Sequence, residues 1–104
     1  MIVEMRTYTV KNGATEQCLR IYESAGLAIQ KAVLGNLIGY FYSEIGPLNQ
    51  IIHLWGFKDL NDRHQRRAAL DKAAGWHEYR MMIHPLIVSQ ETQILNCASF
   101  SPIR

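Results

Sequence analysis

Residues 48–57, Leu-Asn-Gln-Ile-Ile-His-Leu-Trp-Gly-Phe, constrain the fold more than any other stretch of the chain. Their β-branched and aromatic composition predicts a strand, in which side chains alternate between two faces. One face would carry Ile51, His53, Trp55 and Phe57, and the other would carry Leu48, Ile52 and Leu54. A sheet with one solvated face alternates between apolar and polar residues, whereas both faces here are largely apolar. The stretch therefore predicts a sheet that is covered on both sides.

Hydrophobic periodicity predicts the other elements and gives the order β-α-β-β-α-β. Strands are expected at residues 2–10, 37–45, 48–57 and 87–97, and helices at about 14–34, 60–72 and 76–84. The apolar stripe of the long first helix would consist of Cys18, Tyr22, Ala25, Ile29 and Ala32. One face of the last helix would carry Trp76, Tyr79 and Ile83.

Local signals mark where these elements begin and end. Gly35-Asn36 would end the long helix, since both residues tolerate positive φ. Gly46-Pro47 predicts the turn between the second and third strands. Asp59 is a good N-cap for the next helix, and Asp62 three residues later resembles a capping box.

This element order is typical of the ferredoxin-like α+β fold, a four-stranded antiparallel sheet with helices on one face. A chain of 104 residues has room for one domain, here residues 1–104. At this length the simplest cover for the second face of the sheet is a second copy of the same sheet. The sequence therefore predicts a homodimer with two-fold symmetry.

Composition excludes several classes of function. The net charge of +2 is too small to predict a nucleic-acid partner, and no run of apolar residues is long enough to predict a membrane span. The first strand begins at Ile2, which leaves no room for a signal or transit peptide and predicts a cytoplasmic protein. Cys18 and Cys97 are interpreted as small hydrophobic residues rather than as a disulfide or a catalytic thiol.

A series of short motifs follows along nearly the whole chain. They are Arg6-Thr-Tyr8, Ser43-Glu-Ile-Gly-Pro-Leu-Asn49, His53-Leu-Trp55, Arg63-x-x-x-Arg67, Trp76-x-x-Tyr79, Pro85-Leu86 and Gln90-Glu-Thr92. In this order they resemble the NIPSNAP family. The resemblance implies a dimeric α/β-barrel, in which the sheets of two ferredoxin-like protomers face one another. The two-sided third strand indicates the same arrangement independently.

The resemblance implies less about function. Animal NIPSNAP proteins are interaction or scaffold proteins associated with mitochondria and vesicle traffic, and small bacterial members have no assigned reaction. This chain lacks a mitochondrial presequence, so we do not expect the mitochondrial role. The wider superfamily includes cofactor-free monooxygenases, haem-degrading enzymes and isomerases, whose sites lie between the sheet and the helices. No cofactor is expected for this chain.

The first strand supplies charged candidates for a site. Glu4, Arg6 and Tyr8 share one face of this strand, which the predicted topology places beside the third strand. Arg6 could pair with Glu4, Glu44 or Glu91 in a structural ion pair. Alternatively, Arg6 could face a cavity and bind a carboxylate or similar anion.

The expected helix at residues 60–72 supplies two more arginines. Arg63 and Arg67 are four residues apart and therefore on one side of the helix. They could clamp an anionic ligand or an acidic patch of a partner. They could equally pair with Asp59, Asp62 or Asp71 as a solvated helix face.

Aromatic residues and His53 complete the candidates. His53 could be a core histidine bonded to a neighbouring strand, or a proton donor or acceptor in a pocket beside Trp55. Trp76 and Tyr79 could be core packing or the wall of an apolar pocket.

His77 and His84 are seven residues apart but lack the companions of a metal motif, so no metal site is predicted. A haem site can be argued only from His77, because haem-degrading relatives use a helix histidine.

Three hypotheses about function remain open. The first is a protein that binds a small apolar or anionic molecule, and the second is an interaction module that binds a protein partner without chemistry. The third is a cofactor-independent monooxygenase or isomerase that uses His53, Tyr8 or Arg6 as its catalytic residues.

Overall fold

The computed structural model describes residues 1–104, and its elements follow the predicted order. The strands are β1 (Ile2–Val10), β2 (Asn36–Tyr42), β3 (Gln50–Phe57) and β4 (Ile87–Asn96). The α-helices are α1 (Thr15–Ile21), α2 (Leu27–Leu34), α3 (Leu60–Asp71) and α4 (Trp76–Ile83). A π-helical turn, η1 (Tyr22–Gly26), joins α1 to α2, and a 3-10 turn, η2 (His84–Leu86), precedes β4.

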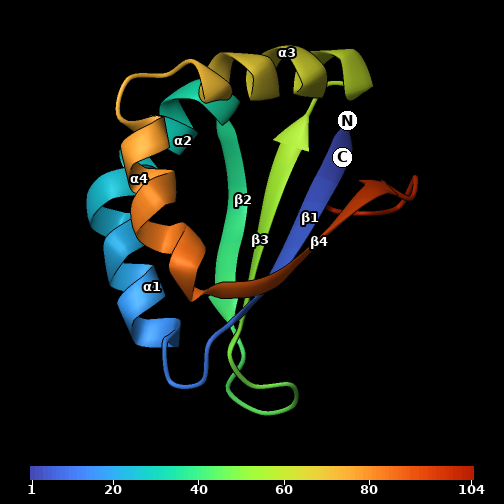
Figure 1. Ribbon diagram of the computed structural model, residues 1–104. Coiled ribbons are helices and arrows are strands. Elements are labelled where there is room, and N and C mark those ends of the chain that lie inside the picture. Colours follow the sequence, from blue (N-terminus) through green and yellow to red (C-terminus); the bar gives the residue numbers. More distant parts are fainter.

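The four strands form one antiparallel sheet in the order β2-β3-β1-β4. Helices α1, α2 and α4 lie on one side of this sheet, and α3 crosses its end where β3 finishes (Figure 1). This is the ferredoxin-like α+β fold that the sequence predicts. No helix is both long and apolar enough to cross a membrane.

The pairing register assigns each strand residue to a face. Arg6 lies opposite His53 on β3 and opposite Thr92 on β4, on the face that the helices cover. On the other face Met5 lies opposite Leu54, and Val3 opposite Leu95. No helix covers this second face. Val3 is buried there beside the C-terminal residues, whereas Met5, Ile52 and Leu54 are only partly buried.

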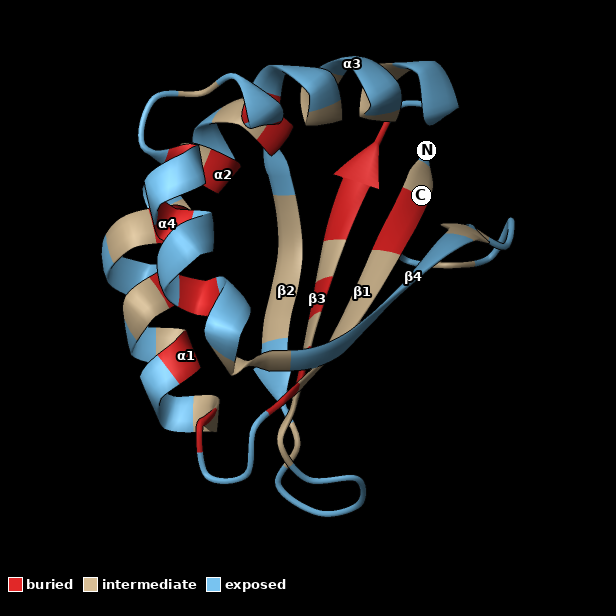
Figure 2. Ribbon diagram, in the orientation of Figure 1, coloured by how far each residue is buried: buried red, intermediate tan, exposed pale blue.

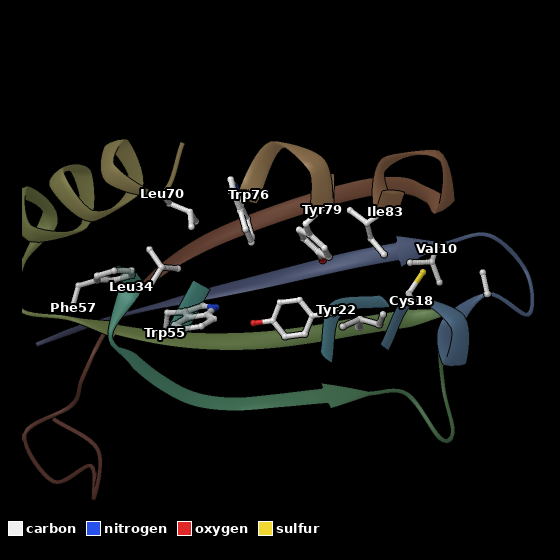
Figure 3. Close-up of a cluster of buried hydrophobic side chains, with 12 residues drawn as sticks. Val10, Cys18, Tyr22, Leu34, Trp55, Phe57, Leu70, Trp76, Tyr79 and Ile83 are labelled. Carbon is white, nitrogen blue, oxygen red and sulfur yellow. The ribbon is translucent and has the colours of Figure 1, made fainter. Parts of the chain in front are cut away.

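The hydrophobic core fills the space between the sheet and the helices (Figure 3). Trp55, Leu34 and Leu70 are almost completely buried there, and so is the predicted α4 face of Trp76, Tyr79 and Ile83. In Figure 2 the buried positions of the sheet lie on β1 and β3, whereas β4 is mostly exposed. Burial of each large apolar side chain contributes about 1.5–3 kcal/mol.

The buried stripe of the long helix differs from the prediction after Tyr22. Gly26, Gln30 and Leu34 are buried, whereas Ala32 is exposed and Ala25 and Ile29 are only partly buried. The cause is the π turn η1, which is wider than an α-helical turn and rotates the following residues about the helix axis. The end of the helix is as predicted, because Gly35 has φ of 89° and donates its N–H to Lys31.

The hairpin between β2 and β3 is also longer than predicted. The strands end at Tyr42 and resume at Gln50, so Leu48 lies in a loop and is 61% exposed. Pro47 has no N–H to donate to a ladder, and Asn49 has a positive φ of 62°, which a strand residue does not adopt. Asn49 instead accepts hydrogen bonds from the N–H groups of Val10 and Gly13.

The predicted start of α3 is confirmed. Asp59 is the N-cap, and its Oδ1 accepts a hydrogen bond of 2.8 Å from the N–H of Asp62. Asp62 reaches back to the N–H of Lys58, one residue before the cap, rather than to the cap itself. These bonds fix the start of the helix that carries Arg63 and Arg67.

Candidate functional site

A cavity of about 170 Å³ lies under the helix-covered face of the sheet. Every strand contributes to its lining, together with η1, α2, α3, α4 and η2. The exposed residues among this lining form its rim and are Asp71, Arg80, His84 and Gln90. Apart from Ile83 and Ile87, the deeper residues are charged or aromatic, or carry an amide or imidazole group, so polar groups face much of this cavity.

Glu4 organises the charged side chains next to this cavity. It is completely buried, and its Oε2 accepts hydrogen bonds from Arg63 Nη2 at 2.6 Å and Nε at 2.9 Å. The same oxygen lies 3.3 Å from Arg6 Nη1. Glu4 therefore holds two guanidinium groups, one from β1 and one from α3. Neither Glu44 nor Glu91 makes an ion pair with Arg6.

Arg6 lines the cavity despite its ion pair. Its Nε donates to the hydroxyl of Tyr8 over 3.0 Å, and its guanidinium lies 5.6 Å from the centre of the Tyr8 ring. Burial acts to lower the pKa of Arg6, but Tyr8 and Glu4 outweigh burial and raise it. Arg6 is thus a fixed positive charge at the cavity wall: it forms the predicted ion pair with Glu4 and also faces the cavity, whereas binding of an anion by Arg6 stays a prediction.

Arg67 is a second positive charge at the cavity and has no carboxylate partner. Its Nη1 is buried and makes no hydrogen bond with another protein group. Burial lowers the pKa of Arg67, and the neighbouring charge of Arg6 lowers it further. A guanidinium nevertheless stays charged at neutral pH, so Arg67 offers an unused donor. Of the predicted carboxylate partners on this helix, only Asp62 forms an ion pair, and it does so with Arg66.

His53 offers a second unused donor. Trp55 Nε1 donates a hydrogen bond of 2.7 Å to His53 Nδ1, so Nδ1 is an acceptor and the proton of neutral His53 lies on Nε2. Nε2 is buried and has no partner in the protein. Burial, with the charges of Arg6 and Arg67, lowers the pKa of His53 to about 3. His53 is therefore neutral at physiological pH and presents an N–H.

Aromatic rings form much of the remaining wall. The Tyr40 ring is stacked between Tyr22, at 4.5 Å, and His53, at 4.6 Å between ring centres. Tyr79 meets Tyr22 edge-on at 5.9 Å and lies 4.9 Å from Trp76. Burial raises the pKa of Tyr22, Tyr40 and Tyr79, so their hydroxyls stay protonated.

Gln30 is a buried polar residue on α2 that also lines the cavity. Its Oε1 accepts a hydrogen bond of 2.6 Å from the Tyr22 hydroxyl. The two residues are eight apart, and the π turn between them turns both toward the sheet. Neither Gln30 nor Tyr40 is among the residues that the sequence singles out for a site. A polar residue within the buried stripe of a helix would have marked Gln30 as a candidate. The predicted stripe followed the α-helical period and therefore did not include Gln30.

The sequence profile of the NIPSNAP family matches residues 3–102. The chain belongs to the NIPSNAP family. This match confirms the resemblance to the NIPSNAP family that the sequence motifs indicate. A NipSnap homologue from Dictyostelium discoideum is 41% identical over 75 residues, covering 72% of this chain and 33% of the relative. The chain spans 23–36% of the length of the curated NipSnap relatives that it matches.

Solved structures give the same result for the fold. A NIPSNAP family protein of unknown function from Agrobacterium tumefaciens superposes with a TM-score of 0.97 at 46% identity, covering 100% of this chain and 94% of that one. A Nitrosomonas europaea protein, provisionally named an antibiotic biosynthesis monooxygenase, superposes with a TM-score of 0.67 at 14% identity. That alignment covers 93% of this chain and 98% of the other, and it shows a shared fold.

The structure brings together most of the residues that the NIPSNAP motifs suggested. Those that line the cavity are Arg6, Tyr8, His53, Arg67, Trp76 and Tyr79. Trp55 and Arg63 do not line it. Trp55 donates a hydrogen bond to His53, which does, and Arg63 pairs with Glu4, which in turn pairs with the lining residue Arg6. His77 is exposed and lies outside the cavity lining, whereas His84 is at its rim.

Proposed function

We propose that this NIPSNAP domain binds a small organic anion in the cavity. The observation that carries the proposal is the pair of unused buried donors, His53 Nε2 and Arg67 Nη1, on two residues that line the same cavity. A buried donor without a partner costs about 1–3 kcal/mol. A bound carboxylate would accept hydrogen bonds from both donors and remove this cost.

The charge balance supports an anion. Arg6, Arg63 and Arg67 place three positive charges near the one negative charge of Glu4, which leaves an excess of two. A buried charge is unfavourable unless it is paired. Asp71 also lines the cavity, but it is exposed at the rim and forms no ion pair. An anionic ligand supplies the missing charge inside the cavity.

The state of His53 favours binding over acid–base catalysis. A general base needs a free lone pair and a pKa near the working pH. In His53 the Nδ1 lone pair accepts from Trp55, Nε2 carries the proton, and the pKa is lowered to about 3. His53 therefore acts as a hydrogen-bond donor at neutral pH rather than as a proton acceptor.

A cofactor-independent oxygenase or isomerase reaction is the second candidate. The same donors and excess positive charge would stabilise the enolate that forms when a carbon next to a carbonyl group gives its proton to a base, for which the Asp71 carboxylate at the rim is available. The fold that the chain shares with the Nitrosomonas europaea protein is compatible with this chemistry. Exchange of such a carbon-bound proton for deuterium, followed by NMR, would support the enzyme hypothesis, and its absence in every bound carbonyl compound would contradict it.

Calorimetric titration tests the binding function. We expect benzoate and cyclohexanecarboxylate to bind at least about tenfold more tightly than their neutral amides, because hydrogen bonds to charged groups contribute about 1.5–3 kcal/mol. Arg67→Met should remove this preference. The matched control Arg20→Met deletes an exposed arginine on α1 and should keep it. Equal binding of acids and amides, or no binding of either acid at millimolar concentration, would contradict the proposal and leave the interaction module as the better hypothesis.

We also propose that the uncovered sheet face forms a homodimer interface. Met5, Ile52 and Leu54 lie on this face and are only partly buried, and the C-terminal residues meet it near Val3, Leu54 and Leu95. Light scattering should give twice the chain mass of 11.9 kDa. Leu54→Asp should yield monomers, whereas Met81→Asp, at an exposed position on α4, should remain dimeric. A monomeric wild type would contradict this proposal.

A further inference from the structure

Gln30 carries a hydrogen-bonding group that the anion site does not use. It is 3% exposed and lines the cavity, and the Tyr22 hydroxyl occupies its Oε1. That hydrogen bond fixes the orientation of the amide, so the NH₂ group is the free end of the side chain. No protein group accepts a hydrogen bond from this NH₂ group, and Gln30 lines the cavity, so the donor is available to a ligand atom there.

This donor is separate from the charged residues. Gln30 lies on α2, whereas Arg67 lies on α3 and His53 on β3. The Gln30 amide is neutral and matches a neutral acceptor such as a hydroxyl or carbonyl oxygen. The cavity therefore offers two kinds of recognition: cationic and imidazole donors for an anion, and an amide donor for a second oxygen.

The walls and the size of the cavity indicate an aromatic ring between these groups. Tyr22, Tyr40, Tyr79 and Trp76 present ring faces or edges, with Tyr40 and Tyr22 stacked at 4.5 Å. Aromatic pairs prefer such stacked and edge-to-face contacts and gain beyond simple burial. The volume of about 170 Å³ is close to that of an engineered cavity of about 150 Å³ that binds benzene. One ring with small substituents fits this volume.

We propose that the ligand is a one-ring aromatic carboxylate with an oxygen substituent on the ring, and that the Gln30 amide donates to this oxygen. The proposal rests on the anion-binding function and specifies its ligand class. Arg67 and His53 would bind the carboxylate, the tyrosine and tryptophan rings would pack against the ring, and Gln30 would select the substituent.

The wild-type protein tests the proposal without any mutation. The three hydroxybenzoates are titrated beside the three methylbenzoates, which have nearly the same shape but no acceptor. At least one hydroxybenzoate should bind about 2- to 12-fold more tightly than its methyl counterpart, as expected for one hydrogen bond. Benzoate should also bind more tightly than cyclohexanecarboxylate. Equal affinities within every hydroxy and methyl pair would overturn the role of Gln30.

Gln30→Leu provides the matched variant, because leucine has a similar volume and no amide. The hydroxy preference should disappear in this variant while benzoate itself still binds. Gln30→Met is a second variant in case leucine disturbs folding, and the result is expected to be the same. A hydroxy preference that persists in folded Gln30→Leu or Gln30→Met would overturn the assignment to Gln30.

The two proposals fail in different ways. If cyclohexanecarboxylate binds as tightly as benzoate, the aromatic class is wrong but the anion-binding function stands. If none of the acids binds, or if their neutral amides bind equally well, the proposed anion-binding function is wrong. The proposed ligand class is then wrong as well.

Discussion

Trp55 donates its indole N–H to His53 Nδ1 over 2.7 Å, and this one hydrogen bond decides which nitrogen of His53 carries the proton. The two residues are neighbours on the same face of β3, two positions apart. With Nδ1 occupied by Trp55, Nε2 is left as the hydrogen-bond donor of a cavity-lining side chain. The tryptophan thus acts on the candidate site through the histidine without lining the cavity itself.

This relationship predicts a single tautomer of His53. Long-range ¹⁵N NMR should show Nε2 protonated and Nδ1 unprotonated, with no titration between pH 8 and pH 5, because burial and the charges of Arg6 and Arg67 lower the pKa to about 3. In Trp55→Phe the hydrogen bond that favours the neutral ring is lost, and the pKa of His53 should rise. A wild-type His53 that titrates above pH 6 would show that the imidazole is not held in this state.

The lowered pKa also predicts how stability depends on pH. Below about pH 6.5 the unfolded chain binds a proton at His53, whereas the folded protein does not until about pH 3. Between these values the free energy of unfolding should fall as the pH falls, by about 1.4 kcal/mol per pH unit from this group. Urea unfolding at pH 7, 6 and 5 should show a steeper fall for wild type than for His53→Gln. Parallel curves for the two proteins would contradict the prediction.

Gly26 sets the spacing of the aromatic wall. A Cβ at this position would lie 2.9 Å from Tyr79 Cε1 and 3.0 Å from Tyr22 Cδ1, both on rings that line the cavity. Gly26→Ala should therefore destabilise the protein by about 1–3 kcal/mol through overpacking, and it should weaken benzoate binding by displacing the rings. Ala28→Ser, on the exposed side of the same helix, should change the free energy of unfolding by less than about 0.5 kcal/mol. An unchanged free energy of unfolding and an unchanged affinity for benzoate in Gly26→Ala would contradict this prediction, because they would show that the Tyr22 and Tyr79 rings can move to make room for the added methyl group.

Glu4 should be the most sensitive charged residue of the fold. Glu4→Gln leaves Arg6 and Arg63 without their buried carboxylate, so we expect a loss of about 3–5 kcal/mol in the free energy of unfolding. The double variant Glu4→Gln/Arg63→Met should recover part of this loss, since it removes one of the uncompensated charges. Chemical denaturation of wild type, Glu4→Gln, Arg63→Met and the double variant measures both effects. A loss in the double variant equal to the sum of the single losses would contradict the coupling.

The sequence predicted the faces of the sheet well, because alternation along a strand needs no knowledge of distant residues. Alternation assigned Arg6 and Tyr8 to one face of β1, and His53 and Trp55 to one face of β3. The pairing register places both pairs on the same side of the sheet. The pairing of Arg63 with Glu4 could not be predicted in the same way. These residues are 59 positions apart, and only the crossing of α3 over the end of the sheet brings them together.

The π turn η1 is the reason that the buried residues of the long helix were predicted incorrectly after Tyr22. An α-helical period counted from Cys18 and Tyr22 leads to Ala25 and Ile29, whereas the wider turn buries Gly26 and Gln30. Nothing in the local sequence marks this turn, whose residues Tyr22 and Gly26 lie against Tyr79 of α4. Gln30 was missed for this reason, although it supplies the amide donor of the proposed ligand site.

The crystal structure of the protein soaked with benzoate tests the anion-binding account most directly. We predict that one benzoate lies in the cavity with its carboxylate oxygens within about 3 Å of Arg67 Nη1 and His53 Nε2. Benzoate bound only elsewhere, or in the cavity with its carboxylate directed away from both donors, would contradict the account.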